Sequence, residues 1–213
     1  MKMKRFTIVF FFVVLILSSM SQAQKADLAF SVGASSVADT KLGFACPACA
    51  AFGQETVNTG HQAFLEAAPG LRLVNARVAS IHLEVPIVGV PHQNLFFGGL
   101  ATTFTASLSS LYITPSIKAK FLPAAHISPW VSAGGGWAHF SLPNDFTNKG
   151  ALQFGGGADF KTPVPHFGLR VEVRDFLSGQ PSFGTPGVGL LGNPQSGFNR
   201  HNVLAGGGIL VHF

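Results

Sequence analysis

Cys46 and Cys49 form the only C-x-x-C motif of the 213-residue chain, a spacing that could serve redox, haem or metal chemistry. A redox role needs a thioredoxin-like βαβ context, and the flanking sequence shows none. Covalent haem attachment needs a histidine directly after the motif, but residue 50 is alanine. Zinc needs two further ligands, and His61 is the only nearby candidate. We therefore predict a small disulfide in a loop, with redox and metal-binding roles as the alternatives.

His126 and Ser128 lie two residues apart, a spacing that could set a general base beside a nucleophile. The pair resembles the catalytic segment of the lipid A 3-O-deacylase barrels, which would imply a lipid-modifying enzyme. A nucleophilic serine also needs an orienting group, and no acidic residue is near in the sequence. The eight histidines form no H-x-x-x-H or H-E-x-x-H motif, so we predict no metal site and no cofactor. We predict a non-enzymatic protein, with the lipid-modifying enzyme as an alternative.

Charged residues make up only 11% of the chain, yet several recur at every second position of apolar segments. In residues 167–174, four apolar residues alternate with Gly168, Arg170, Glu172 and Arg174. Successive side chains of a β-strand point to opposite faces, so the three charges share one face and the apolar residues the other. This pattern is typical of a membrane β-barrel, whose strands face lipid on one side and the barrel interior, or lumen, on the other.

The same alternation places ten charged side chains in the lumen. They are Glu66, Arg72, Glu84, Lys118, Lys120, Asp159, Lys161, Arg170, Glu172 and Arg174. Both signs are present and unpaired interior charges are costly, so we predict a lumen ion-pair network. Like charges directly opposite each other are destabilising, which favours the strand register that pairs Asp159 with Arg170. The alternative is a narrow ion path, which would make the protein a channel or small-solute porin.

Eight segments follow this alternation, and the connections between them differ in length. The segments are residues 28–33, 65–73, 81–88, 111–121, 130–140, 152–161, 167–174 and 200–213. The connections 35–62, 89–110 and 177–199 are long, 142–150 is medium, and 75–79, 122–128 and 162–166 are short. Outer-membrane barrels have short periplasmic turns and longer extracellular loops. We predict an all-β fold, an eight-stranded antiparallel transmembrane up-and-down β-barrel with both termini in the periplasm.

Two features complicate individual segments. Pro69, Pro86 and Pro115 fall inside the alternating runs, although proline cannot donate a hydrogen bond to a strand ladder. Trp130 and Trp137 have opposite parity and cannot both face lipid in one regular strand. We assign Trp137 to the outer face.

The N-terminus predicts export. Lys2, Lys4 and Arg5 precede an apolar run at 6–17, and 21–23 reads Ser-Gln-Ala, which fits a signal-peptidase site. We predict a signal peptide at 1–23 and a single barrel domain at 24–213. Cleavage would lower the formal net charge from +5 to +2, so the basic character gives no reason to expect nucleic-acid binding.

The alternation, the Arg170-x-Glu172-x-Arg174 motif and the terminal run 208–213 together resemble the OmpA-like and OmpX-like small outer-membrane barrels. The resemblance implies a location in the bacterial outer membrane. It also implies an assembly signal at Gly208, Val211 and Phe213 for the barrel-assembly machinery, although Val211 stands where an aromatic residue is more usual. We expect no periplasmic peptidoglycan-binding domain of the kind that larger members of this family carry.

The long connections could bind partners outside the cell. Residues 95–97 read Leu-Phe-Phe, and residues 177–199 mix glycine and proline with apolar side chains. Exposed apolar groups in long loops are common at interaction sites. We predict a structural or surface-interaction role, with outer-membrane lipids, lipopolysaccharide and an extracellular ligand as partners.

The predicted loop disulfide can be tested on intact cells. A membrane-impermeant thiol reagent should label the protein only after reduction, because a disulfide offers no thiol to the reagent. The variant Cys46→Ser leaves Cys49 free and should be labelled without reductant. Labelling of the unreduced wild-type protein would contradict the disulfide and favour the redox or metal-binding alternatives.

Overall fold

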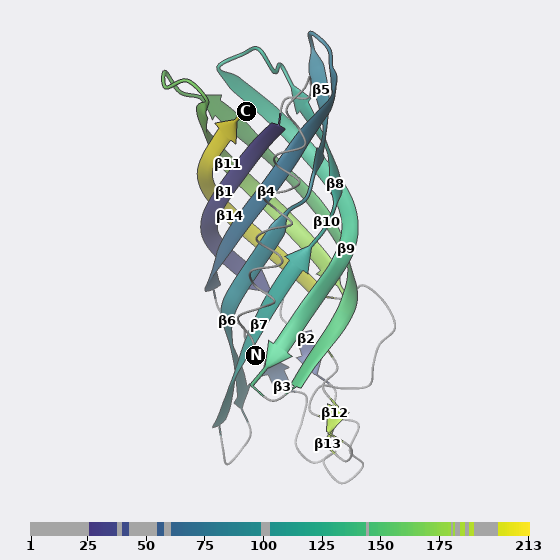
Figure 1. Ribbon diagram of the computed structural model, residues 1–213. Helices are drawn as coiled ribbons and strands as arrows, with labels where there is room; N and C mark the ends of the chain where they lie inside the picture. Colours follow the sequence, from purple (N-terminus) through teal and green to yellow (C-terminus); the bar gives the residue numbers. More distant parts are fainter. Residues whose placement is uncertain are drawn as a thin grey trace, which may run out of the picture.

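Strands account for most of the residues that the computed structural model in Figure 1 describes. The structure describes residues 26–37, 40–42, 55–57, 61–98, 103–143, 145–179, 181, 184–185, 188–189 and 200–213. The predicted signal peptide and both cysteines lie outside these residues. No helix in the described ranges is long and apolar enough to cross a membrane.

The described strands divide into long and short ones. The long ones are β1 (Ala26–Val37), β4 (His61–Asn75), β6 (Ile87–Gly98), β7 (Thr103–Ile113), β9 (Ile127–Leu142), β10 (Asp145–Lys161), β11 (Phe167–Ser178) and β14 (Arg200–His212). The short ones are β2 (Thr40–Leu42), β3 (Glu55–Val57), β5 (Ala79–Glu84), β8 (Ser116–Phe121), β12 (Gly184–Thr185) and β13 (Val188–Gly189).

Ten of these strands close into a barrel. Its wall has eight members, which we call staves, and each stave is either one long strand or two strands that continue each other. β5 and β6 are two parts of one stave, and β7 and β8 are two parts of the next. The staves follow one another in chain order, each pairs antiparallel with the next, and β14 pairs with β1 to close the ring. The predicted eight-stranded up-and-down architecture is therefore confirmed.

Two of the three prolines explain the divided staves. Pro86 separates β5 from β6, and Pro115 separates β7 from β8, whereas Pro69 lies inside β4 opposite Leu28. The carbonyl oxygens of Pro69, Pro86 and Pro115 accept backbone hydrogen bonds from Val85, Thr114 and Gly135, at 2.9, 3.2 and 3.1 Å. A proline lacks the donor but keeps its acceptor, so the wall continues past each of them.

Two predicted connections are too long. The β6–β7 hairpin extends the wall to Gly98 and resumes it at Thr103, within the predicted connection 89–110. The β9–β10 hairpin pairs Leu142 with Asp145, within the predicted connection 142–150. Backbone pairing continues there after the alternation of apolar and polar residues has ended, so the sequence pattern does not reveal it.

The two faces of the wall follow the predicted alternation. Leu169 and Val171 are 51% and 49% exposed on the outer face, whereas Arg170 between them is 1% exposed. Trp137 is 47% exposed and Trp130 only 2%, so the assignment of Trp137 to the outer face is confirmed. A bulge between Arg72 and Val74 breaks the alternation at the end of β4.

The two ends of the barrel differ in their connections. The turns 76–78, 122–126 and 162–166 lie at the end where β1 begins and β14 ends, which we call the short-turn end (Figure 1, top). The opposite end carries β2, β3, β12 and β13, and we call it the long-loop end. The chain end is held at the short-turn end, where the Phe213 N–H donates to the Ala26 carbonyl at 2.9 Å.

A substitution at Gly208 tests how closely β14 approaches β1 where the barrel closes. A Cβ at Gly208 would lie 1.8 Å from the carbonyl oxygen of Phe30, whereas a Cβ at Gly89 would meet no atom within 4 Å. Gly208→Ala should therefore lower the free energy of unfolding by about 1–3 kcal/mol, the usual cost of overpacking. Gly89→Ala is the matched control and should change it by much less. Urea unfolding in detergent, followed by tryptophan fluorescence, would measure both, and equal effects would contradict this packing.

Candidate functional site

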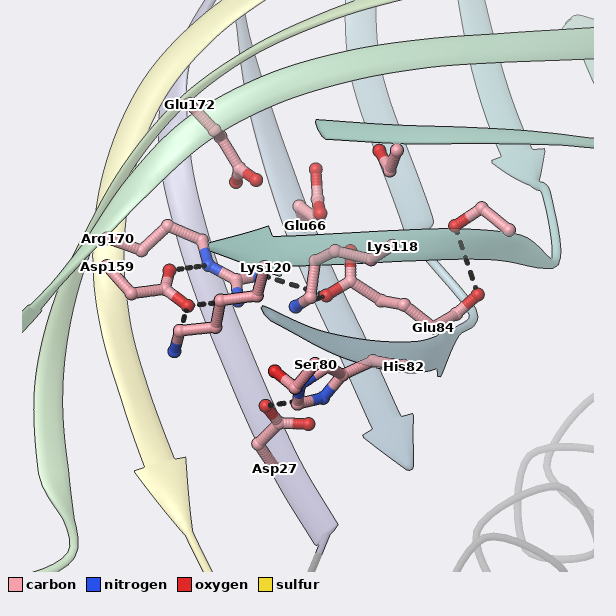
Figure 2. Close-up of polar contacts among 12 residues, drawn as sticks. Asp27, Glu66, Ser80, His82, Glu84, Lys118, Lys120, Asp159, Arg170 and Glu172 are labelled. Atoms are coloured by element: carbon pink, nitrogen blue, oxygen red, sulfur yellow. Dashed lines mark hydrogen bonds and ion pairs between the residues drawn. The ribbon is translucent and has the colours of Figure 1, made fainter. Parts of the chain in front are cut away.

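A charged cluster fills the barrel interior towards the short-turn end, and Glu84 lies at its centre (Figure 2). Glu84 comes from β5 and contacts the ammonium of Lys118 on the paired strand β8. Arg170 reaches the same carboxylate at 3.1 Å and Arg174 at 2.6 Å, both from β11. Three cations from two separate parts of the wall thus share one carboxylate.

Asp159 anchors the second part of the cluster. Arg170 donates to both of its carboxylate oxygens, at 2.8 Å from Nε and 3.3 Å from Nη2, and Lys120 contacts it at 2.8 Å. The β10–β11 register pairs Asp159 with Arg170 and Gly157 with Glu172. This is the register that the charges predict.

Arg174 links the remaining two carboxylates. Its Nη2 lies 3.1 Å from Glu66 and 3.0 Å from Glu172, in addition to its contact with Glu84. Eight of the ten predicted lumen residues therefore lie in one cluster, with four carboxylates and four cations. They are Glu66, Glu84, Lys118, Lys120, Asp159, Arg170, Glu172 and Arg174.

Arg72 and Lys161 lie outside this cluster. Arg72 is half-buried next to the bulge of β4, and Lys161 is exposed and donates to the Ala124 carbonyl at 2.7 Å. Both are at strand ends, where the wall opens to the short-turn end and side chains can leave the interior.

Trp130 completes the cluster, although the sequence gives no sign of this role beyond its parity. The guanidinium carbons of Arg170 and Arg174 each lie 5.1 Å from the indole centroid, and the Lys118 ammonium lies 5.5 Å from it. Cations are attracted to an indole face, and more strongly where water is excluded. The indole therefore stabilises the cations and fills the cross-section of the barrel.

An apolar cluster fills the interior nearer the long-loop end. Its members are buried and come from seven staves: Phe64, Val88, Val90, Leu108, Tyr112, Ala138, Phe140, Ala151, Phe176 and Leu204. The Tyr112 hydroxyl accepts a hydrogen bond from Asn202 at 3.2 Å, and Asn202 in turn accepts one from Ser35 at 2.7 Å. The lumen is thus occupied by two successive layers, one charged and one apolar.

A cavity of about 230 Å³ opens beside the charged cluster at the short-turn end. Three polar side chains in its wall form a chain of contacts (Figure 2). The Ser80 hydroxyl lies 2.9 Å from Nε2 of His82, and Nδ1 of His82 lies 3.6 Å from the Asp27 carboxylate. From the sequence, the spacing Ser80-x-His82 indicates that these two side chains share one face of a strand. It gives no sign of Asp27, which lies on β1, separated from β5 by β4.

Gly70 explains how Asp27 reaches His82 across β4. The register sets Gly70 opposite Asp27 on one side and opposite Glu84 on the other. A Cβ at Gly70 would lie 2.4 Å from an Asp27 carboxylate oxygen. The carboxylate therefore occupies the space that any larger residue at position 70 would fill.

The other predicted candidates lie elsewhere. The Ser128 hydroxyl donates to the Leu122 carbonyl at 2.9 Å and His126 is exposed, both at the short-turn end. Within the described ranges, no group of three or more His, Cys, Asp or Glu side chains could hold a metal ion. Of the predicted assembly signal, Gly208 and Val211 lie in β14, and Phe213 follows that strand with 64% of its surface exposed.

Comparison with known proteins identifies the fold. The chain matches no protein-family model and no curated protein. It is similar to solved structures of Neisserial surface protein A (TM-score 0.55, 11% identity over 90% of this chain and 100% of that one) and of OprG, an outer membrane protein from Pseudomonas aeruginosa (TM-score 0.56, 14% identity, 90% and 96%). These neighbours are eight-stranded outer-membrane β-barrels, and at this identity the likeness shows the fold alone.

The Asp159–Arg170 pair can be tested by a double-mutant cycle of Asp159→Asn and Arg170→Gln. Each single change removes one partner of a buried charge, although Arg170 keeps Glu84 and Asp159 keeps Lys120, and should lower the free energy of unfolding by about 3 kcal/mol. The losses should be clearly non-additive, because both changes remove the contact between Asp159 and Arg170.

The pair Asp175 and His201 provides the matched control. These side chains contact at 2.8 Å but are 31% and 47% exposed, so their coupling should be below about 1 kcal/mol. Urea unfolding in detergent would measure both cycles. A coupling near zero for Asp159 and Arg170 would show that they do not interact in the folded barrel.

Proposed function

We propose that this chain is an integral outer-membrane protein with a closed lumen and a structural or surface-interaction role, similar to the OmpA-like and OmpX-like barrels. The observation that carries the proposal is the filling of the lumen by two layers. Ion conduction needs a continuous polar path. Here the ion pairs around Trp130 fill one section and the apolar cluster around Tyr112 and Phe140 fills the next.

The outer face supports insertion in a lipid bilayer. Exposed large apolar side chains recur on all sides of the wall, as at Val32, Leu65, Val131, Phe154 and Ile209. A soluble protein rarely exposes an apolar surface of this extent. On this proposal residues 1–23 direct export, the segment ending at Phe213 is recognised by the barrel-assembly machinery, and lipopolysaccharide is a neighbour in the outer leaflet.

The orientation follows from the two ends. Outer-membrane barrels keep short turns in the periplasm and long loops outside the cell. The short-turn end would therefore face the periplasm, together with the start of β1 and the end of β14. The β9–β10 hairpin would project from the cell, where the exposed ring of Phe146 lies 5.6 Å from that of His139. Such an ordered hairpin could carry a binding surface for an extracellular ligand.

This orientation argues against the lipid A deacylase alternative based on His126 and Ser128. Those enzymes act on the outer-leaflet lipid, whereas both residues lie at the short-turn end. The Ser128 hydroxyl is also engaged with the Leu122 carbonyl. The proposed role therefore assigns no chemistry to this pair.

The closed lumen can be tested by electrical recording. Purified protein that shows the heat-modifiable gel migration of a folded barrel should produce no conductance steps in planar lipid bilayers, because both layers block the path. An open porin inserted in the same bilayer is the positive control. Reproducible steps from the folded protein would favour the channel alternative. Recovery of the folded protein from the soluble periplasmic fraction of cells would contradict the location.

A further inference from the structure

The cavity at the short-turn end holds three side chains in the order that a serine hydrolase uses. The Ser80 hydroxyl is at Nε2 of His82, and the Asp27 carboxylate is at Nδ1 (Figure 2). In a catalytic triad the base accepts the serine proton at one ring nitrogen while the acid orients the ring through the other. In this cavity the serine likewise lies at one ring nitrogen of His82 and the carboxylate at the other.

The strand geometry fixes two members of this group relative to each other. Ser80 and His82 are alternate residues of β5, so both face the interior. Asp27 reaches the imidazole from β1 across Gly70, as described above. The gap of 3.6 Å between Nδ1 and the carboxylate is longer than a hydrogen bond, and Nδ1 has no other hydrogen-bond partner. Catalytic contacts of this kind are commonly long in unliganded enzymes and shorten when substrate binds.

The cavity also offers cationic and apolar groups. Lys120 pairs with Ser80 in the β5–β8 register and its ammonium contacts Asp159 at 2.8 Å, and Arg72 and Lys161 line the same cavity. A cation beside a nucleophile stabilises the oxyanion that forms during acyl transfer. Phe160 and Leu210 supply apolar wall. A volume of about 230 Å³ fits a short acyl group and is too small for a two-chain lipid.

We propose that Ser80, His82 and Asp27 form a hydrolytic site for short-chain acyl esters that carry an anionic group and enter from the short-turn end. Ser80 is the nucleophile, His82 the general base and acid, and Asp27 the positioning residue. The site is distinct from the His126–Ser128 pair. It adds an activity to the proposed structural role and departs from the sequence-based prediction of a non-enzymatic protein.

The reaction needs water and the ester alone. Ser80 Oγ bonds to the acyl carbon while its proton passes to His82 Nε2. The bond between the acyl carbon and the alcohol oxygen then breaks, and His82 gives the proton to the leaving alcohol. Water attacks the acyl-serine, again losing a proton to Nε2. The acid leaves as Ser80 regains that proton, so the residues return to their starting state.

A covalent probe tests the site without any variant. Folded full-length protein in detergent is treated with a fluorophosphonate, which reacts with serines activated by a base, and the adduct is located by peptide mass spectrometry. The proposal expects the adduct on Ser80. No adduct, or an adduct on another residue, would overturn it.

Variants then separate catalysis from structure, each first checked for heat-modifiable folding. Ser80→Ala and His82→Gln should abolish both labelling and the hydrolysis of 4-nitrophenyl hemisuccinate, a short ester that carries a free carboxylate. Ser116→Ala is the matched control, since Ser116 is also a buried inward-facing serine but donates to the Glu84 carbonyl outside the cavity. It should keep the wild-type rate. Equal rates for Ser80→Ala and wild type would refute the assignment.

Asp27→Asn tests the positioning role. An amide in place of the carboxylate cannot stabilise the imidazolium or select the reactive tautomer, so kcat should fall by about 10²-fold or more with KM little changed. A purely structural Asp27 would alter stability and leave kcat unchanged. Wild-type kcat in folded Asp27→Asn would remove Asp27 from the site.

Discussion

The energetic cost of a charge without a partner in a dry interior is the constraint on which the barrel depends. Glu84 is 1% exposed and is surrounded by the cations of Lys118, Arg170 and Arg174. Desolvation of such a group is compensated only if its partners are held in good geometry. Because Glu84 lies on β5 and its partners lie on β8 and β11, the cluster fixes the relative position of staves on opposite sides of the barrel.

The cost of an unpaired interior charge also explains how the lumen is filled. Trp130 lies among three of the cations, so the charged layer leaves little open space, and the apolar layer next to it needs no polar partners. Two layers of different chemistry thus fill a lumen that is only as wide as its side chains. At the short-turn end the layer gives way to a cavity, where Ser80, His82 and Asp27 meet.

The composition of the wall explains this cavity. Gly70 has no side chain, which lets the Asp27 carboxylate cross β4. The bulge after Arg72 turns the end of β4 away from the regular alternation and leaves Arg72 half-buried at the cavity. Gly70 and the bulge after Arg72, both near the end of β4, therefore create the cavity that holds Ser80, His82 and Asp27. The middle of the barrel has no such irregularity in β4, and side chains fill it.

Local alternation determined much of this protein by sequence alone. It gave the eight staves, their faces and the Asp159–Arg170 register, because side-chain direction along a strand has a fixed period of two. Contacts between distant staves could not be read this way. Glu84 meets Arg174 only because the sheet closes and brings β5 and β11 to face each other, and Asp27 meets His82 across β4 only because Gly70 leaves room for the carboxylate. The alternation indicates which side chains face the interior, but which of them contact one another depends on how distant strands pack together, and this required the three-dimensional structure.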